Sequence, residues 1–138
     1  MKVAVRYCTR SGNTKKVADA IAEEAHVKAE DIEVPLPEDV DLLFLGSSLY
    51  GMDVDKRVYA FFNENTKKIG LLASFGTAAS PASSIGAIEK LCNQHDIPLS
   101  SDSFRCYGSF GMIHKDRPND EDLKLAKEFA KKVLHEAK

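Results

Sequence analysis

The sequence predicts an α/β fold in which a parallel sheet is covered by helices on both faces. Short apolar runs alternate with amphipathic helical patterns along the chain, an arrangement that favours parallel strands joined by helices. The run from Leu42 to Leu45 is continuously apolar, as expected of a strand that is buried on both sides. With 138 residues, 43% of them hydrophobic, the chain suits one domain (residues 1–138) with one substantial core.

Five apolar runs are the expected strands. They occupy residues 3–7, 32–34, 42–46, 69–75 and 103–107. Five such strands suit the order 2-1-3-4-5, in which ligands bind beyond the carboxyl ends of the first, third and fourth strands. This rule selects three loops for closer attention, at residues 8–14, 46–55 and 75–81.

Four helical patterns connect or follow these strands. They begin near Thr14, Asp55, Pro81 and Asn119. In each pattern, apolar side chains recur at the three- and four-residue spacing of one helix face. No helical pattern separates the second run from the third, where Pro35 and Pro37 interrupt the chain. We therefore expect that crossover to be short or irregular.

The first loop has the chemistry of a phosphate site. It combines three hydroxyl side chains with a glycine that lets the backbone approach closely, and it opens a helix whose first N–H groups attract anions. The lysine-bearing P-loop pattern of nucleotide triphosphatases is absent, which favours a terminal monophosphate held by neutral donors. The candidate residues are Thr9, Arg10, Ser11, Gly12, Asn13 and Thr14. A plainer interpretation, a well-capped helix after a strand, stays open.

The second loop joins an aromatic residue to a glycine. Tyr50 can stack on a large flat ring and exclude water from it. Gly51 tolerates a positive φ and a reorientation of its peptide. Taken alone, Tyr50 would be interpreted as a half-buried tyrosine and Gly51 as part of an ordinary turn. Because both follow the third strand, where ligands are expected, we favour ring binding.

These two loops resemble those of the flavodoxin family. Residues 9–14 are similar to the family's Thr-x-Ser/Thr-Gly-x-Thr phosphate loop, and residues 46–53 to its Gly-x-Ser-x-aromatic-Gly-x-Asp loop. The resemblance implies a three-layer flavodoxin-like fold that binds FMN without a covalent bond and exchanges single electrons with redox protein partners. Ser47 or Ser48 is expected to lie near enough to the first loop in this architecture to hydrogen-bond the phosphate or the ribityl chain, and Leu49 is a further cofactor-binding candidate. By the same resemblance, Tyr50 is expected to stack on the flavin, and the Gly51 carbonyl is expected to turn toward flavin N5 in the half-reduced state.

The third loop departs from the family pattern. Flavodoxins usually have Gly-Asp-x-x-Tyr here, with the tyrosine over the outer flavin face, whereas this chain has neither the acid nor the tyrosine. The remaining candidates are Phe75, Gly76, Thr77 and Ala78, of which the last two can offer backbone groups to the pyrimidine edge. In the loop after the fifth run, Phe110 and Met112 are alternatives for covering the ring, or they pack on the end of the sheet.

Composition excludes several other classes of protein. A formal net charge of −2 is not basic enough for nucleic acid, and no apolar run has the length of a membrane span. The first residues lack a signal peptide's apolar stretch, so we expect a cytoplasmic protein. Three distant cysteines, Cys8, Cys92 and Cys106, indicate neither a disulfide framework nor a metal site, and we expect them to be buried.

Two other functions remain open at this stage. One is a small FMN-dependent NAD(P)H reductase of the quinone or azo type, which the missing outer tyrosine favours because hydride transfer needs an open ring face. The other is a flavin-free binding module of the same fold. An electron carrier needs no catalytic acid or base, so we assign none. We expect Lys56 and Arg57 to be solvated surface charges, with contact to a partner or to a nicotinamide phosphate as the alternative.

Overall fold

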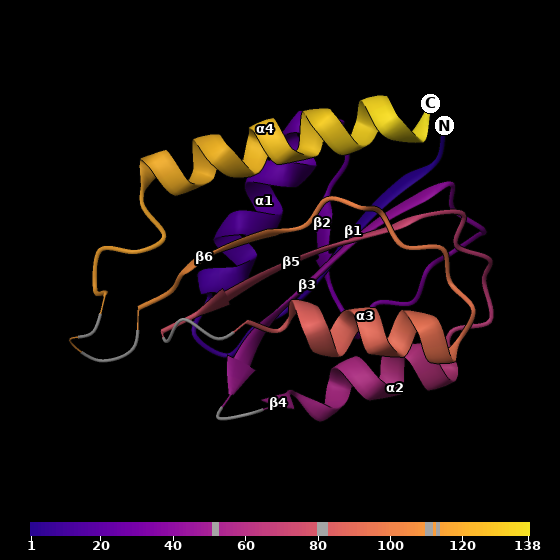
Figure 1. The fold of residues 1–138 in the computed structure, drawn as a ribbon, viewed down its shortest axis with the longest axis horizontal. Coiled ribbons are helices and arrows are strands. Elements are labelled where there is room, and N and C mark those ends of the chain that lie inside the picture. Colours follow the sequence, from indigo (N-terminus) through magenta and orange to yellow (C-terminus); the bar gives the residue numbers. More distant parts are fainter. Residues whose placement is uncertain (51–52, 80–82, 110–111, 113) are drawn as a thin grey trace.

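The structure is a computed structural model that describes residues 1–50, 53–79, 83–109, 112 and 114–138 (Figure 1). Along the chain, the elements are β1 (Val3–Cys8), α1 (Asn13–Ala25), β2 (Ala29–Asp31), β3 (Leu42–Tyr50), β4 (Asp53–Val54), α2 (Lys56–Glu64), β5 (Leu72–Ala78), α3 (Ile85–Gln94), β6 (Phe104–Tyr107) and α4 (Asp120–Ala137). Helices α1, α2 and α4 begin within one residue of the predicted starts, whereas α3 begins at Ile85, four residues after the predicted Pro81.

The sheet has the predicted topology. Its strands run in the order β2-β1-β3-β5-β6, and each neighbouring pair is parallel. Because β5 and β6 are the fourth and fifth of the long strands, this is the order 2-1-3-4-5. The two-residue strand β4 was not predicted; it pairs antiparallel with the end of β3. Figure 1 shows α1 and α4 on one face of the sheet and α2 and α3 on the other, which confirms the three-layer α/β architecture.

The two faces of the central strand β3 explain why its sequence is continuously apolar. Phe44 packs toward α1 and α4, where its ring meets that of Phe129 edge-on at 5.8 Å between centroids. Leu43 and Leu45 belong to the opposite cluster, with side chains of α2 and α3. Leu43, Phe44 and Leu45 are all fully buried. The strand therefore anchors the sheet from both sides and fixes where its carboxyl end emerges.

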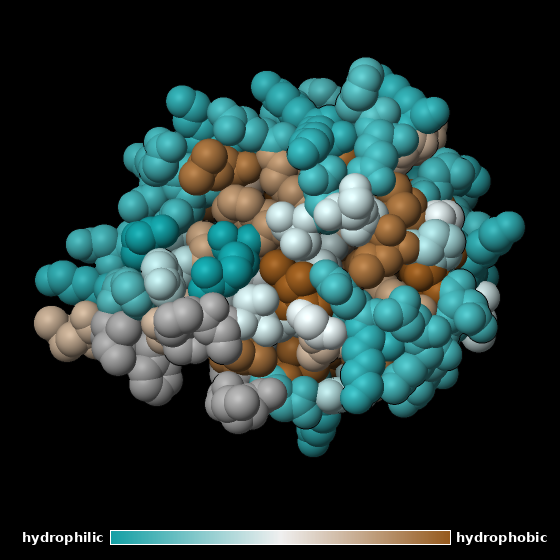
Figure 2. Space-filling model, viewed as in Figure 1, coloured by the Kyte–Doolittle hydropathy of each residue, from teal (hydrophilic) through white to brown (hydrophobic). Residues whose placement is uncertain are grey.

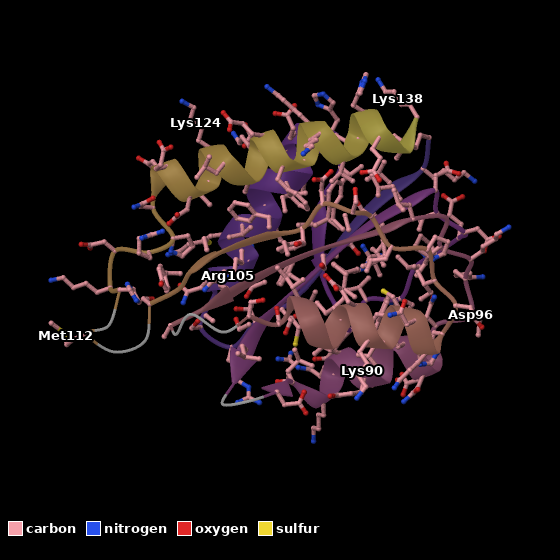
Figure 3. The ribbon with its side chains drawn as sticks, viewed as in Figure 1. Lys90, Asp96, Arg105, Met112, Lys124 and Lys138 are labelled. Atoms are coloured by element: carbon pink, nitrogen blue, oxygen red, sulfur yellow. The ribbon has the colours of Figure 1, made fainter. Side chains whose placement is uncertain are left out.

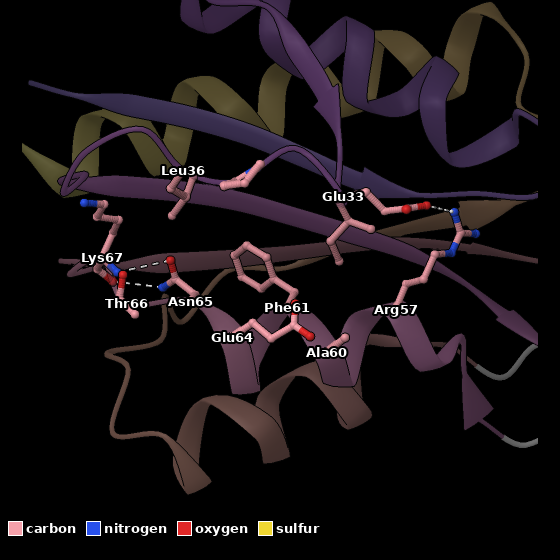
Figure 4. A pocket seen from close by; sticks show the side chains of 11 residues that line it. Glu33, Leu36, Arg57, Ala60, Phe61, Glu64, Asn65, Thr66 and Lys67 are labelled. Atoms are coloured by element: carbon pink, nitrogen blue, oxygen red, sulfur yellow. Dashed lines mark hydrogen bonds and ion pairs between the residues drawn. The ribbon is translucent and has the colours of Figure 1, made fainter.

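The second strand and the crossover after it differ from the expectation in one respect. The strand is Ala29–Asp31, three residues before the predicted 32–34. The crossover at residues 32–41, all of them described, contains no helix, as expected. Ile32, Leu36 and Val40 instead pack as coil on the α2 and α3 face. A hollow of about 470 Å³ remains between this crossover and α2, with Phe61 inside it (Figure 4).

The face of the molecule in Figure 2 is polar over α4 and more apolar along the β6 side of the sheet. Figure 2 shows hydrophilic side chains over α4 and hydrophobic ones gathered between α4 and α3, along the edge that β6 forms. Among the residues that the structure describes, no helix combines the length and the apolar character that crossing a membrane requires.

Candidate functional site

The three loops selected from the sequence begin at adjacent strand ends. In the sheet register, Cys8 lies beside Ser47, Ser48 beside Thr77, and Ala78 beside Tyr107. Because these strands are parallel, the loops that follow β1, β3 and β5 all leave from the carboxyl ends of the strands, at the left in Figure 1. The candidate residues are therefore brought together by the topology itself.

The first loop presents an uncapped helix start. Gly12, the N-cap of α1, has φ of 92°, and its N–H donates to the Thr9 hydroxyl at 2.9 Å. No side chain caps α1, and its first turn carries no acidic residue. The same holds for α3, whereas Asp55 caps α2 and Asn119 caps α4. The space that a Cβ on Gly12 would enter is open within 4 Å. The first N–H groups of α1 are thus well placed to receive an anion, with Ser11 exposed beside them.

Three hydroxyl groups tie the loops to one another. Thr14 Oγ1 lies 2.6 Å from Ser48 Oγ and 2.8 Å from Thr77 Oγ1, and the last two are 3.2 Å apart. All three residues are buried, Thr14 completely. A hydroxyl has one hydrogen and two acceptor sites, so each member can donate to one neighbour and accept from the other. We call these residues the hydroxyl ring; in it the Thr14 hydroxyl joins the loops, whereas the sequence suggested an open phosphate donor.

The other predicted residues divide between this site and the core. Ser47 is fully buried; its hydroxyl donates to the Ser48 carbonyl, and its carbonyl accepts from Ser84 next to Gly76. Only Ser48 of the two serines thus bonds to the first loop. The Phe75 ring lies in the core with α1 and α4, so β5 offers only backbone at that position. Ala78 is buried and Leu49 half-buried.

The connection after β6 is fastened to the first loop, which the sequence did not indicate. Asn13 is buried, and its Nδ2 donates to the Ser109 carbonyl at 3.0 Å. The Ser109 hydroxyl donates in return to Asn13 Oδ1 at 3.3 Å. The side chain of Met112, farther along this connection, is 81% exposed and lies at the far left of Figure 3. Phe110, the alternative cover for the ring, lies outside the described residues.

The expected ring-binding residues are described only in part. Tyr50 ends β3 and pairs with Asp53 of β4, but its side chain lies outside the described part of the structure, as does all of Gly51. Their roles toward a flavin stay predictions from the sequence.

A charged cluster borders the first loop. Asp55 is only 6% exposed, yet its carboxylate accepts from the Arg57 backbone at 3.0 Å, from the Arg57 guanidinium at 3.2 and 3.3 Å, and from Arg10 Nε at 3.0 Å. The hydrogen bonds from Arg57 lower the pKa of Asp55 to about 2. Arg57 is thus a structural partner of Asp55 rather than a solvated surface charge. No sequence pattern links Arg10 with Asp55, because they are 45 residues apart.

The three thiols are buried and protonated. Cys8, Cys92 and Cys106 are buried, as predicted. Desolvation raises the pKa of Cys8 to about 11 and that of the other two to about 12, so all three are protonated at neutral pH.

Comparisons with known proteins agree with this fold and identify the family. The model of the family described as "Flavodoxin domain" matches residues 4–97. An uncharacterized protein of Methanocaldococcus jannaschii is 30% identical, over 97% of this chain and 99% of its own. A flavodoxin from the domain Archaea superposes with a TM-score of 0.83 at 20% identity, covering 99% of both chains. Oxidised Flavodoxin 2 from Bacillus cereus gives 0.76 at 19% identity, with the same coverage.

Proposed function

The chain belongs to the flavodoxin family, and on that premise we propose that it binds FMN without a covalent bond and carries single electrons between redox proteins. The observation that carries the proposal is the uncapped start of α1, set among the buried hydroxyls where three loops meet. Helices α2 and α4 have side-chain caps, whereas α1 and α3 do not. At the start of α1 the space beside Gly12 is also open, so its first N–H groups are donors suited to a phosphate.

The residues present fit the phosphate end of FMN. In the proposal, the backbone N–H groups at the start of α1 and the exposed Ser11 hold the phosphate. Ser48, which at 7% exposure is the most accessible member of the hydroxyl ring, reaches toward the phosphate or the ribityl chain. Arg10 is paired with Asp55, so no essential cation is assigned to phosphate binding. These donors are neutral, as the sequence predicted for a terminal monophosphate.

In the proposal, the flavin ring binds beside the second and third loops. Tyr50 stacks on one face, and the backbone of residues 77–78 meets the pyrimidine edge. The Gly51 peptide would lie beside the flavin and would offer its carbonyl as an acceptor to N5. When bound, FMN supplies the redox chemistry, and the protein supplies burial, orientation and a docking face for its redox partners. The single-domain organisation of residues 1–138 and the cytoplasmic location stay parts of the same proposal.

The reductase remains a second candidate because of one observation. Where flavodoxins usually have the tyrosine of Gly-Asp-x-x-Tyr, the pattern that begins at Gly76 has Ser80 in this chain, so this position supplies no aromatic cover. An open outer face would admit a nicotinamide ring for hydride transfer.

An absorbance spectrum and one steady-state assay test the proposal. The purified protein, supplied with FMN and freed of excess by gel filtration, is expected to retain about one flavin per chain and to oxidise NADPH slowly. Rapid NADPH oxidation by the holoprotein would favour the reductase. A protein that retains no flavin would favour the flavin-free binding module.

A further inference from the structure

We propose that Arg57 and Asp55 form a clasp that positions the phosphate loop, so that Arg57 controls phosphate affinity without contacting the phosphate. The inference rests on the proposed function, because it assigns the phosphate of FMN to residues 9–14. It adds Arg57 to that function as a positioning residue, outside the three loops that the sequence predicted to bind the ligand.

The clasp begins with a carboxylate that has little freedom to move. Asp55 is the N-cap of α2 and is nearly buried, and its two oxygens receive four hydrogen bonds from Arg57 and Arg10. One turn farther along, Val58, Phe61 and Phe62 bury the inner face of α2 in the core. The carboxylate is therefore fixed to the body of the molecule rather than to a mobile surface segment.

Arg57 extends this fixed point to the phosphate loop. Its Nη2 donates to the Thr9 carbonyl at 3.3 Å as well as to Asp55 Oδ2, while its Nη1 donates to Glu33 at 3.3 Å. Figure 4 shows Arg57 reaching across to Glu33 at one end of the hollow beside α2. A guanidinium can satisfy these separate acceptors at once because its donors form a planar fork, which a lysine ammonium lacks.

Thr9 passes the restraint on to the start of α1. Its carbonyl accepts from Arg57, and its hydroxyl accepts the N–H of Gly12, the residue with φ of 92°. The left-handed geometry of Gly12 orients the first turn of α1. Loss of Arg57 would release Thr9 on one side and, through Thr9, loosen the turn that aims the N–H groups at a phosphate.

A charge effect is the main alternative, and the substitutions separate the two. Arg57→Lys keeps the positive charge but loses the fork, whereas Arg57→Met loses both. Arg117→Met is the matched control, because the Arg117 guanidinium makes a similar two-bond pair with Asp122 at the start of α4. Arg117 is linked to the first loop through its backbone carbonyl, which accepts from the Ser109 N–H, and the substitution keeps that carbonyl. Each apoprotein is titrated with FMN and with riboflavin, which lacks the phosphate, and binding is followed by quenching of flavin fluorescence. Thermal unfolding is recorded for each.

If Arg57 positions the loop, Arg57→Lys and Arg57→Met each weaken FMN by about tenfold, the equivalent of roughly 1.4 kcal/mol. Riboflavin affinity is expected to change less than about threefold, and Arg117→Met is expected to leave the FMN-to-riboflavin ratio unchanged. In the apoprotein, hydrogen exchange of the Gly12 amide is expected to accelerate in both Arg57 variants. That readout requires no bound cofactor.

Other outcomes overturn the inference in distinguishable ways. Full FMN affinity in Arg57→Lys together with a loss in Arg57→Met would assign the effect to charge. Equal losses for FMN and riboflavin would assign it to general destabilisation. Unchanged FMN affinity in both variants would reject the clasp but would leave the proposed FMN binding in place. A wild-type protein that binds neither flavin would reject the proposed function and this inference with it.

Discussion

The hydroxyl ring gives the sharpest prediction about stability. Thr14→Val keeps the size of a completely buried side chain but removes its hydroxyl, and with it the contacts of 2.6 and 2.8 Å to Ser48 and Thr77. Each neutral hydrogen bond contributes about 1 kcal/mol net. One of the two remaining hydroxyls also loses an acceptor. We therefore expect the free energy of unfolding to fall by about 2–3 kcal/mol, or the midpoint by roughly 6–10 °C for a chain of this size.

Urea and thermal unfolding of the apoprotein measure this effect. Thr66→Val is the matched control, because Thr66 is exposed on the rim of the hollow, and we expect its effect to stay within about 0.5 kcal/mol. Thr77→Val is expected to cost less than Thr14→Val, since it leaves the shorter Thr14–Ser48 contact intact. A variant with all three hydroxyls removed should lose less than the sum of the single losses, because no buried hydroxyl is left without a partner. If Thr14→Val is as stable as Thr66→Val, the three hydroxyls do not bond as described.

Three further predictions concern other parts of the chain. Gly46→Ala would press its Cβ into the buried Phe75 ring and is expected to cost about 1–3 kcal/mol of stability. Gly86→Ala, whose Cβ meets nothing within 4 Å, is expected to add about 0.5–1 kcal/mol, so equal melting points would contradict the packing described. Asp55 has a pKa of about 2 in the fold against an ordinary 3.8, so its contribution of about 2 kcal/mol to the free energy of unfolding is present above pH ~4 and is lost as the pH falls toward 2. The stability difference between wild type and Asp55→Asn should therefore shrink over that interval. A constant difference would argue against the ion pairs. Gly51→Ala should lower the oxidised/half-reduced flavin potential by tens of millivolts, at roughly 40 mV per kcal/mol of lost stabilisation; redox titrations that give identical yields of half-reduced flavin would reject a role of the Gly51 carbonyl at N5.

The strand order and the helices were predictable because periodicity reports burial. The continuous apolar run of β3 and the three- and four-residue spacing in α2 follow from packing on both faces of a parallel sheet. The same signal misplaced β2, since Ile32 is apolar for another reason. It belongs to a coil that covers the sheet where no helix does, together with Leu36 and Val40. Strand β4 has two residues, too few for any periodicity.

The site was predictable to the level of loops but not of individual contacts. Hydroxyl residues and glycines at strand ends indicate a phosphate site, because the topology gathers those ends. The sequence could not show that Thr14 would bond to Ser48 and Thr77, since hydroxyls on loops far apart in the chain carry no mark of their partners. Nor could it distinguish Arg57, with its four acceptors, from a solvated arginine. Side-chain pairing across distant segments is set by the packed structure rather than by local pattern.

The most direct test of the central claim is a fluorescence titration of the wild-type apoprotein with FMN and with riboflavin under identical conditions. Because the site at the start of α1 is proposed to hold a phosphate, we expect one FMN to bind per chain, and riboflavin to bind at least about tenfold more weakly, since one phosphate contact set is worth more than roughly 1.4 kcal/mol. Equal affinities for the two flavins, or no binding of either, would contradict the account.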